Sequence, residues 1–424
     1  YGAPPKWTWE NYPPLWFHVI AIFGSIIQDF NLAGRLVCLA AYAAIGVLIC
    51  LIIERFTKSR FVGIWGALAW WFWLAAFDVS HVPVNDPHVP AIALSLVALY
   101  CIVREPDSPR WLGASAVLFS LSLFTKHSLT AFPAATAIYL FFTSRRRFAI
   151  FAGAGVLACV ALLLLTMAID GPHIFQHMSP PRAYYPWGIA DNTGAYLRLA
   201  SVGVAVALIW ALRNLSNVPA RLLMWAFAIA LPFAMVYGGG AGSNINHYYD
   251  PMISTILLMS LALPELAGLA TQSPFPRLSL GVLLIVPFFL TAIAIIPSRI
   301  YSDQAAYDHR DRLESEFNFV ADLVRQQPGP AICESTPICS AAGKPREYDP
   351  FHADQLLRVG EMRPEQLAEV IASRHFGAIE LEWRSSEPMD ARPRLHFAGP
   401  VMRALFATYQ LKTRTDRHAV FVPR

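Results

Sequence analysis

Charged residues are scarce in this sequence. Asp, Glu, Lys and Arg make up 15% of its 424 residues, against about 25% in a typical soluble domain. The shortage is uneven, because residues 14–297 hold nearly all the long apolar runs while 301–424 are rich in Arg, Asp and Glu. A wholly soluble protein is therefore excluded. The composition predicts an α-helical polytopic membrane domain over residues 1–300 and a small C-terminal α/β soluble domain over 301–424.

Several enzyme motifs are also missing. The C-terminal domain has no nucleophile elbow, zinc motif or nucleotide fingerprint, which favours recognition or docking over catalysis in that part of the chain. A glycine-rich run at 238–242 is not followed by Gly-Lys-Ser/Thr, so it is not a Walker loop. The net charge of +4 is spread over a membrane protein and gives no argument for a nucleic-acid partner.

The sequence begins at Tyr1 rather than Met, and no signal peptide is visible. Residues 1–14 are aromatic, rich in proline and loop-like. We expect the sequence to be an N-terminally truncated fragment that lacks its first span.

Ten apolar segments are candidate membrane spans, although several of them are shorter than the about 20 apolar residues that a crossing needs. A further apolar segment, 15–27, is too short for a crossing and is interpreted as an interfacial helix. The candidate spans are approximately 31–54, 61–80, 87–103, 110–126, 128–143, 148–169, 194–212, 220–237, 248–267 and 278–297.

Lys and Arg occupy alternate connections between these spans, which marks those connections as cytoplasmic. Ten crossings then place both ends of the sequence on the outer side. The outer connections contain most of the Asp, His and Asn of the membrane domain, and polar groups gathered at one face predict a site open to that face. The basic connections hold Arg55, Lys58 and Arg60; Arg104 and Arg110; Arg145, Arg146 and Arg147; Arg213 and Arg221; and Arg277.

The motif Asn85-Asp86-Pro87-His88 opens the third span. Asp86 can be a helix cap, or it can be a catalytic carboxylate or metal ligand at the membrane edge. Asp78, His81 and His88 are close in sequence, and such a cluster can bind a divalent ion such as Mg²⁺ or Mn²⁺. Both interpretations stand, with Asp86 and His88 as the candidate ligands.

Lys126 and His127 close the fourth span. Lys126 can extend to the interface as a structural residue, or its point charge can hold a phosphate. The outer loop before the ninth span contains Asn244, Asn246 and Tyr248, where bare glycine N–H groups can bind an anion. A flexible turn with interfacial tyrosines explains that loop equally well.

Cys333 and Cys339 lie in the predicted outer domain, where a disulfide is permitted, and the spacing leaves both the bonded and the free state open. Strands are predicted at 331–333, 378–381 and 419–422, with a helix at 364–373.

The ordered outer motifs resemble those of the GT-C membrane glycosyltransferases of the protein O-mannosyltransferase and lipid A sugar-transferase type. The likeness covers nearly the whole chain, and the order and sidedness of loose motifs carry it. The motifs are Tyr12-Pro13-Pro14-Leu15, Arg35, Asn85-Asp86-Pro87, Leu123-Phe124-Thr125-Lys126, Gly242-Ser243-Asn244-Ile245-Asn246-His247-Tyr248 and the tail stretch 333–351.

This resemblance implies transfer of a sugar from a polyprenyl-phosphate donor to a lipid, glycan or protein acceptor at the outer face of a bacterial inner membrane. It implies that Asp86 lies near the donor phosphate or its metal, and that Lys126 holds that phosphate. The implied substrate-binding set also includes Tyr12, His127, Asn244, Asn246 and Tyr248. The family's usual catalytic carboxylate lies in an earlier loop, which we expect to precede Tyr1, and Glu10 is not promoted in its place.

Two rival functions are open from the residues alone. A secondary transporter also has many spans, but its polar residues gather near the midplane, whereas the polar residues of this chain gather at the outer edge. A non-catalytic membrane scaffold is the other alternative.

Overall fold

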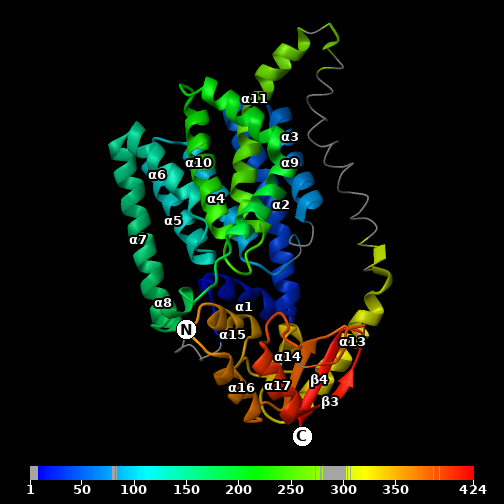
Figure 1. Ribbon diagram of the computed structural model, residues 1–424. Coiled ribbons are helices and arrows are strands. Elements are labelled where there is room, and N and C mark those ends of the chain that lie inside the picture. The colour runs from blue at the N-terminus through cyan, green and yellow to red at the C-terminus, as the bar shows by residue number, and fades with distance from the viewer. Residues whose placement is uncertain are drawn as a thin grey trace. The chain divides into compact units, whose positions relative to one another are not determined.

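The computed structural model describes residues 8–424 except 79–81, 83, 273, 277–278, 280–301, 303, 306, 385 and 391. The predicted tenth span, 278–297, lies outside the described residues, as do His81 and the side chain of Asp78. The chain divides into two compact units, one built mainly of helices and one that contains the C-terminal segment. Figure 1 shows the elements of both.

The helical unit comprises Tyr12–Gly171 and Tyr185–Ile300. Its described elements match nine predicted spans and the predicted interfacial helix. They are α1 (Leu15–Ile27), α2 (Phe30–Thr57), α3 (Arg60–Asp78), α4 (His88–Arg104), α5 (Pro109–Thr125), α6 (Ala131–Thr143), α7 (Arg145–Asp170), α9 (Pro186–Arg213), α10 (Val218–Gly238), the short 3₁₀ helix η2 (Ile245–Tyr248) and α11 (Tyr249–Thr271).

Local sequence explains where several of these helices begin. The carboxylate of Asp29 accepts hydrogen bonds of 2.9 Å from the backbone N–H groups of Asn31 and Leu32 at the start of α2. Ser144 caps α7 in the same way, and Asn217 caps α10. These caps satisfy N–H groups that the first helical turn leaves without partners.

The bounds of several helices differ from those of the predicted spans, and α9 and α6 are two examples. The α9 helix begins at Pro186 rather than at 194, because a proline suits the first helical position and a helix can continue through polar residues that lower the hydropathy. The α6 helix begins at Ala131 rather than at 128. It has 13 residues and a length of about 20 Å, less than the ~30 Å of a bilayer core.

Five of the described helices are long and apolar enough to cross a membrane. Their outer surfaces are apolar as well: α7 buries only Phe151 and Thr166, while Leu157 on the same helix is 71% exposed. Apolar side chains in this number on a surface mark contact with lipid. The chain is therefore an integral membrane protein. The five helices are Phe30–Thr57, Arg145–Asp170, Pro186–Arg213, Ala220–Gly238 and Ile245–Thr271.

The core of the helical unit surrounds α11, in which every residue from Tyr249 to Leu263 is buried. Two fully buried tryptophans of α3, Trp70 and Trp73, belong to the same core. Trp70 packs edge-on against Tyr249, with 6.0 Å between ring centroids. Tight packing of this kind drives helix association inside a membrane, where lipid tails are as apolar as the side chains.

The second unit joins the C-terminal segment Tyr301–Arg424 to residues 8–11 and to Pro172–Tyr184. Four strands form one mixed sheet in the order β1-β2-β4-β3, with β1 parallel to β2 and the other pairs antiparallel. Its elements are α8 (Ile174–Met178), α13 (Arg310–Arg325), β1 (Ala331–Cys333), α14 (Thr336–Ala341), α15 (Pro350–Arg358), α16 (Pro364–Ala372), β2 (Ala378–Glu382), α17 (Gly399–Thr408), β3 (Tyr409–Arg414) and β4 (His418–Pro423).

The predicted strands at 331–333, 378–381 and 419–422 and the helix at 364–373 are confirmed as β1, β2, β4 and α16. Cys333 and Cys339 form a disulfide with their Cα atoms 5.7 Å apart, which decides the alternative that the sequence left open. The bond joins the end of β1 to α14 beside the sheet.

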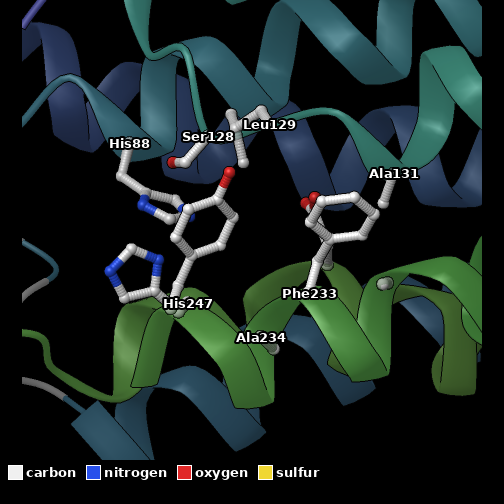
Figure 2. A pocket seen from close by; sticks show the side chains of 10 residues that line it. His88, Ser128, Leu129, Ala131, Phe233, Ala234 and His247 are labelled. Carbon is white, nitrogen blue, oxygen red and sulfur yellow. The ribbon is translucent and has the colours of Figure 1, made fainter. Parts of the chain in front are cut away.

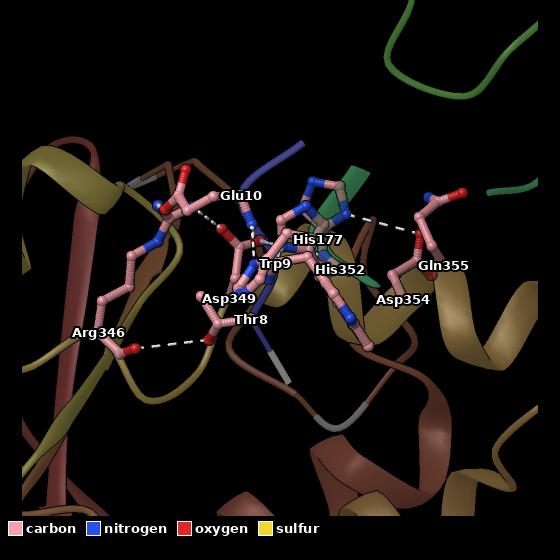
Figure 3. Close-up of polar contacts among 10 residues, drawn as sticks. Thr8, Trp9, Glu10, His177, Arg346, Asp349, His352, Asp354 and Gln355 are labelled. Atoms are coloured by element: carbon pink, nitrogen blue, oxygen red, sulfur yellow. Dashed lines mark hydrogen bonds and ion pairs between the residues drawn. The ribbon is translucent and has the colours of Figure 1, made fainter. Parts of the chain in front are cut away.

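Polar contacts hold the segment 8–11 and the region of α8 against α15 within this unit (Figure 3). The Trp9 N–H donates to Nδ1 of His352 at 3.4 Å, and the Glu10 N–H donates to Nδ1 of His177 at 3.1 Å. The Glu10 carboxylate accepts from Arg346 at 2.5 Å, and Arg346 also donates to Asp349 at 2.7 Å. Three stretches distant in sequence are therefore linked through buried or half-buried polar atoms.

Candidate functional site

An ion pair links the start of α4 to the end of α5. The Asp86 Oδ1 and Lys126 Nζ atoms lie 3.6 Å apart, and the Lys126 side chain is only 6% exposed while that of Asp86 is 21% exposed. The two residues are 40 positions apart in sequence but both come from predicted outer loops. The structure thus brings together two of the residues that the sequence singled out.

Antiparallel packing of α4 and α5 explains this encounter. The Ser122 hydroxyl donates to the Ala91 carbonyl at 2.7 Å and lies 3.1 Å from the Ser95 hydroxyl. Lys126 comes directly after the last residue of α5, and its backbone N–H donates to the Ser122 carbonyl at 2.8 Å. These bonds set the register of the two helices, and that register places the end of α5 beside the start of α4.

The backbone of the Asn-Asp-Pro motif is held by α2. The Cys38 thiol donates to the Asp86 carbonyl at 3.3 Å, and a Cβ added at Gly34 would lie 2.2 Å from Asn85. Glycine at position 34 therefore allows the motif to approach the helix closely. The Asp86 carboxylate also accepts the His88 N–H at 2.7 Å, so the capping contact expected from the sequence is present.

Tyr12 completes this group of residues. Its ring lies beneath the Lys126 ammonium, with 4.4 Å between Nζ and the ring centroid. A cation over an aromatic face gains about 0.5–2 kcal/mol, more when it is shielded from water. The predicted residues Tyr12, Asp86 and Lys126 thus form one cluster, which we call the Lys126 cluster.

The electrostatics of the Lys126 cluster suit an anionic ligand. A carboxylate at the start of a helix and an ammonium at the end of one both complement the helix dipoles. The Nζ–Oδ1 distance of 3.6 Å exceeds that of a hydrogen bond, so the N–H groups of Lys126 are not committed to Asp86. A buried ammonium held in this way can bind a phosphate oxygen directly.

A small cavity adjoins the other side of the α4 start, with a volume of about 10 Å³, room for about one water molecule. Figure 2 shows His88 and His247 beside each other in its wall, with Ser128 near His88. The His88 ring lies 5.9 Å from that of His247 and 5.5 Å from that of Tyr249. Asp250 also lines this cavity, and its Oδ1 atom is buried without a hydrogen-bond partner among the described residues.

The other predicted binding residues lie in the α5–α6 turn and around η2. His127 is exposed. The Asn244 side chain caps η2 by accepting from the Ile245 N–H at 2.8 Å. The Tyr248 hydroxyl hydrogen-bonds that of Thr193 in α9 at 2.6 Å, and Asn246 is buried. These contacts give Asn244 and Tyr248 a role in tying the loop before α11 to its neighbours.

The predicted metal pair, Asp86 and His88, does not form a recognisable metal site. No group of three or more His, Cys, Asp or Glu side chains that could hold an ion occurs in the part of the chain that the structure describes. The carboxylate of Asp86 faces Lys126, while the ring of His88 packs against His247 and Tyr249. Of the predicted pair, the Asp86 carboxylate is therefore the group that can bind a cation.

Sequence reasoning missed the cavity residues Asp250 and Tyr237. Asp250 lies two positions after the quoted motif, in the stretch His247-Tyr248-Tyr249-Asp250. A carboxylate at the start of a long apolar helix is a signal that could have found it. Tyr237 lies within an apolar run and had no such signal.

Residues 11–169 match the family model described as dolichyl-phosphate-mannose-protein mannosyltransferase. The predicted family resemblance is confirmed. Tyr12, Asp86 and Lys126 all lie within the matched residues of this glycosyltransferase family, whereas Asn244, Asn246 and Tyr248 lie outside them. No curated protein matches the chain by sequence.

Solved structures agree on the fold. The chain is similar to ArnT from Cupriavidus metallidurans in the apo state, with 14% identity, 98% of this chain and 88% of that chain covered, and a TM-score of 0.59. The same protein bound to undecaprenyl phosphate matches with 11% identity, the same coverage and a TM-score of 0.59.

An archaeal enzyme shares the fold as well. The oligosaccharyltransferase AglB from Archaeoglobus fulgidus, in complex with an inhibitory peptide and a dolichol-phosphate, matches with 13% identity and a TM-score of 0.56, covering 99% of this chain and 67% of that chain. The chain thus has the mostly helical polytopic membrane fold of GT-C transferases, with a small mixed sheet in its C-terminal region.

Proposed function

We propose that this protein is a membrane glycosyltransferase that moves a sugar from a polyprenyl-phosphate donor to a lipid, glycan or protein acceptor at the outer face of a bacterial inner membrane. The Lys126 cluster carries the proposal, because a buried ammonium that lies 3.6 Å from its carboxylate partner, too far for a hydrogen bond, is among residues matched to a glycosyltransferase family. A lipid-linked phosphate is a ligand that such an ammonium can reach from within the bilayer.

The distribution of positive charge supports the proposed face. Arg104 and Arg110 lie at the ends of α4 and α5 opposite to Asp86 and Lys126. Since Lys and Arg gather in cytoplasmic loops, the Lys126 cluster belongs to the outer side. In the proposal the chain crosses the membrane about ten times, and its C-terminal domain, 301–424, lies outside the cytoplasm.

In the proposed reaction the donor phosphate binds the Lys126 ammonium and replaces Asp86 as its charge partner. The bond between the sugar C1 and the phosphate oxygen breaks, and the acceptor oxygen forms a new bond to C1. The acceptor hydroxyl gives its proton to a carboxylate, for which Asp86 is the candidate once it is released from Lys126. Lys126 stabilises the negative charge of the departing polyprenyl phosphate. His127, Tyr12, Asn244, Asn246 and Tyr248 remain proposed substrate contacts.

A requirement for Mg²⁺ or Mn²⁺ stays a prediction. Mg²⁺ is commonly bound by one or two carboxylates together with substrate phosphates, so Asp86 would be its ligand from this chain. No step above depends on the ion. Transfer measured with and without a chelator, followed by return of each ion, tests it.

Binding of undecaprenyl phosphate to the purified full-length chain, measured by native mass spectrometry against undecaprenol, tests the proposal without knowledge of the sugar. We expect preference for the phosphate in the wild type, its loss in Lys126→Ala and partial recovery in Lys126→Arg. Lys58→Ala is the matched control, since Lys58 lies in the α2–α3 connection at the opposite end of the bundle.

The transfer reaction itself requires a second measurement. We expect Asp86→Asn to retain the preference for undecaprenyl phosphate but to lose sugar transfer from undecaprenyl-phosphate-linked donors to membrane glycolipids. If the wild type bound undecaprenyl phosphate and undecaprenol equally well, Lys126 would have no role in binding the phosphate. Flux of donor or sugar across sealed vesicles without any transfer would support the transporter instead.

A further inference from the structure

Two histidines of the second unit hold the backbone of segment 8–11 (Figure 3). Nδ1 of His177 in α8 accepts the Glu10 N–H at 3.1 Å. Nδ1 of His352 in α15 accepts the Trp9 N–H at 3.4 Å. An imidazole nitrogen can accept a hydrogen bond only while it carries no proton. The segment is therefore held by histidines in their neutral form.

Burial gives these two bonds their importance. His177 is 6% exposed and His352 is 8% exposed. The Trp9 ring packs edge-on against the His352 ring, with 5.8 Å between the centroids. Water therefore has little access to either imidazole ring. Losing an acceptor in such a place leaves a backbone N–H without a partner, which destabilises the arrangement by more than the bond contributes.

Charged groups around His352 come from three parts of the unit. Asp349, at the start of α15, has its Oδ1 atom 3.8 Å from Nδ1 of His352, and the charges of Arg346 and Arg182 also act on the ring. Burial lowers the pKa of His352 from its ordinary value of 6.5. The two arginines reinforce this shift and Asp349 opposes it. His352 is therefore neutral at pH 7 and takes up a proton at acidic pH.

A proton on Nδ1 of His352 reverses the contact with the segment. The nitrogen becomes a donor that faces the Trp9 N–H, and two donors cannot share a hydrogen bond. The charged ring is instead attracted to Asp349, whose Oδ1 atom is already near. Protonation thus exchanges the bond to Trp9 for an ion pair within α15 and its cap.

His177 loses its bond in the same way, because its protonated Nδ1 would face the Glu10 N–H. The Glu10 carboxylate acts on His177 through its charge and pairs with Arg346. Burial raises the pKa of Glu10 from its ordinary 4.5, against the opposing charges of Arg346 and His177. Acid therefore weakens the ion pair of Glu10 as well as both backbone bonds.

We propose that His177 and His352 form a pH-sensitive clasp on segment 8–11, closed when both rings are neutral and open when both are protonated. We call it the histidine clasp. The closed state is fully favoured above about pH 6.5 and is lost as the pH falls through the lower pKa of the buried His352. Segment 8–11 continues directly into Tyr12 of the Lys126 cluster, so opening loosens the chain that leads into that cluster.

Hydrogen exchange of the Trp9 and Glu10 amides in the full-length chain tests the histidine clasp. Mass spectrometry at residue resolution is the readout, at pH 7.5 and pH 5, with correction for the intrinsic pH dependence of exchange. We expect protection of each amide to fall about fivefold at pH 5, the effect of one typical net hydrogen bond. Equal protection at the two pH values would overturn the proposal.

The double variant His177→Asn/His352→Asn removes the titration but keeps an acceptor, since the Asn Oδ1 atom can take the place of Nδ1. Its protection at pH 5 should stay within about twofold of that at pH 7.5. The double variant His177→Leu/His352→Leu has no acceptor, so its protection should be low at both pH values. A pH response that survives in the Asn variant would contradict the clasp.

Two controls separate the histidines from their neighbours. His375→Asn changes a histidine of the same unit that pairs with Glu347 on the surface, and Glu10→Gln removes the titrating carboxylate while keeping its backbone N–H. Both variants should respond to pH as the wild type does. If Glu10→Gln lost the response, the carboxylate rather than the histidines would be the sensor, and the proposal would fail.

The effect of the histidine clasp on the Lys126 cluster rests on the proposed function, whereas the clasp itself does not. We expect the preference for undecaprenyl phosphate over undecaprenol to fall more at pH 5 in the wild type than in His177→Asn/His352→Asn. Comparing the two proteins at the same pH removes the change in charge of the phosphate itself. An equal fall in both would exclude coupling to the cluster. No preference at either pH would refute the proposed function, while the exchange measurements would still decide the clasp.

Discussion

Buried charge is used differently in the two units. In the helical unit the ammonium of Lys126 is almost fully buried, yet its distance of 3.6 Å to Asp86 is too long for a hydrogen bond. In the C-terminal unit the carboxylate of Glu380 is fully buried and accepts from the Ser335 N–H at 3.0 Å, with His418 Nδ1 2.6 Å away. The Lys126 ammonium thus makes no hydrogen bond to its carboxylate partner, whereas the Glu380 carboxylate is hydrogen-bonded.

The physical reason lies in the cost of burying a charge. A buried ion destabilises a protein unless hydrogen bonds replace its lost water. A satisfied charge such as Glu380 can serve the fold alone, while an incompletely satisfied one in a membrane domain marks a place where a ligand acts. We therefore keep a role in ligand binding for Lys126 as part of the proposed function, and attribute to the Glu380 network a role in stabilising the fold.

Removing one lysine from each unit gives the largest expected contrast. Lys126→Ala should lower sugar transfer by about 100-fold or more, as loss of a group that stabilises transition-state charge does, with little change in melting temperature. Lys344 donates to the carbonyls of Gln327 and Gly329, so Lys344→Ala should destabilise the protein by about 1 kcal/mol and leave transfer in the surviving folded protein unchanged.

Transfer rates and thermal denaturation of both variants, measured in the same detergent, provide the check. The reverse pattern, in which Lys126→Ala unfolds the protein and Lys344→Ala loses only activity, would end the distinction between the two units.

A change of pH should affect the stability of the C-terminal unit through Glu334. Burial raises its pKa from 4.5 to about 7, so the folded protein binds the proton more tightly than the unfolded chain. The stabilisation from this proton is complete below about pH 4.5 and is lost as pH rises to about 7. Glu334→Gln should therefore raise the melting temperature by a few degrees at pH 8 and by less at pH 5.

Circular dichroism melting curves at the two pH values measure this difference, and Glu369→Gln is the control because Glu369 is exposed on α16. An equal gain at both pH values would show that the charge of Glu334 is not the cause.

The smallest effect is expected for Glu10. Its carboxylate pairs with Arg346, and both side chains are about two-fifths exposed, at 37% and 42%, so the pair is worth about 1 kcal/mol or less. Glu10→Gln should leave transfer within about twofold, as surface substitutions usually do. Kinetic comparison with Asp86→Asn decides this, because an equally large loss in Glu10→Gln would make Glu10 a catalytic carboxylate.

Much of the fold could be predicted from local patterns. Hydropathy located nine of the described helices because lipid demands long apolar runs, and Val-rich or Ile-rich stretches located β1, β2 and β4. The edge strand β3, with its polar Gln410, Lys412 and Arg414, was missed because an exposed strand carries no such signal. The start of α9 was also missed, since a helix can extend beyond its apolar part.

The Lys126 cluster was predictable only as separate residues. Tyr12, Asp86 and Lys126 were each singled out, but nothing local to them shows that a serine register between α4 and α5 brings Asp86 within 3.6 Å of Lys126. The histidine clasp had no motif at all, because segment 8–11, α8 and α15 come from three stretches that are distant in sequence.

The sequence alone thus determined that the chain lies in a membrane and which family its motifs resemble, because hydropathy and motif order are properties of the linear chain. Only the tertiary structure decided that Lys126 meets Asp86 and Tyr12, that Cys333 bonds Cys339 and that His177 and His352 hold segment 8–11. Those facts are distances between atoms, and packing between elements that are distant in sequence sets them.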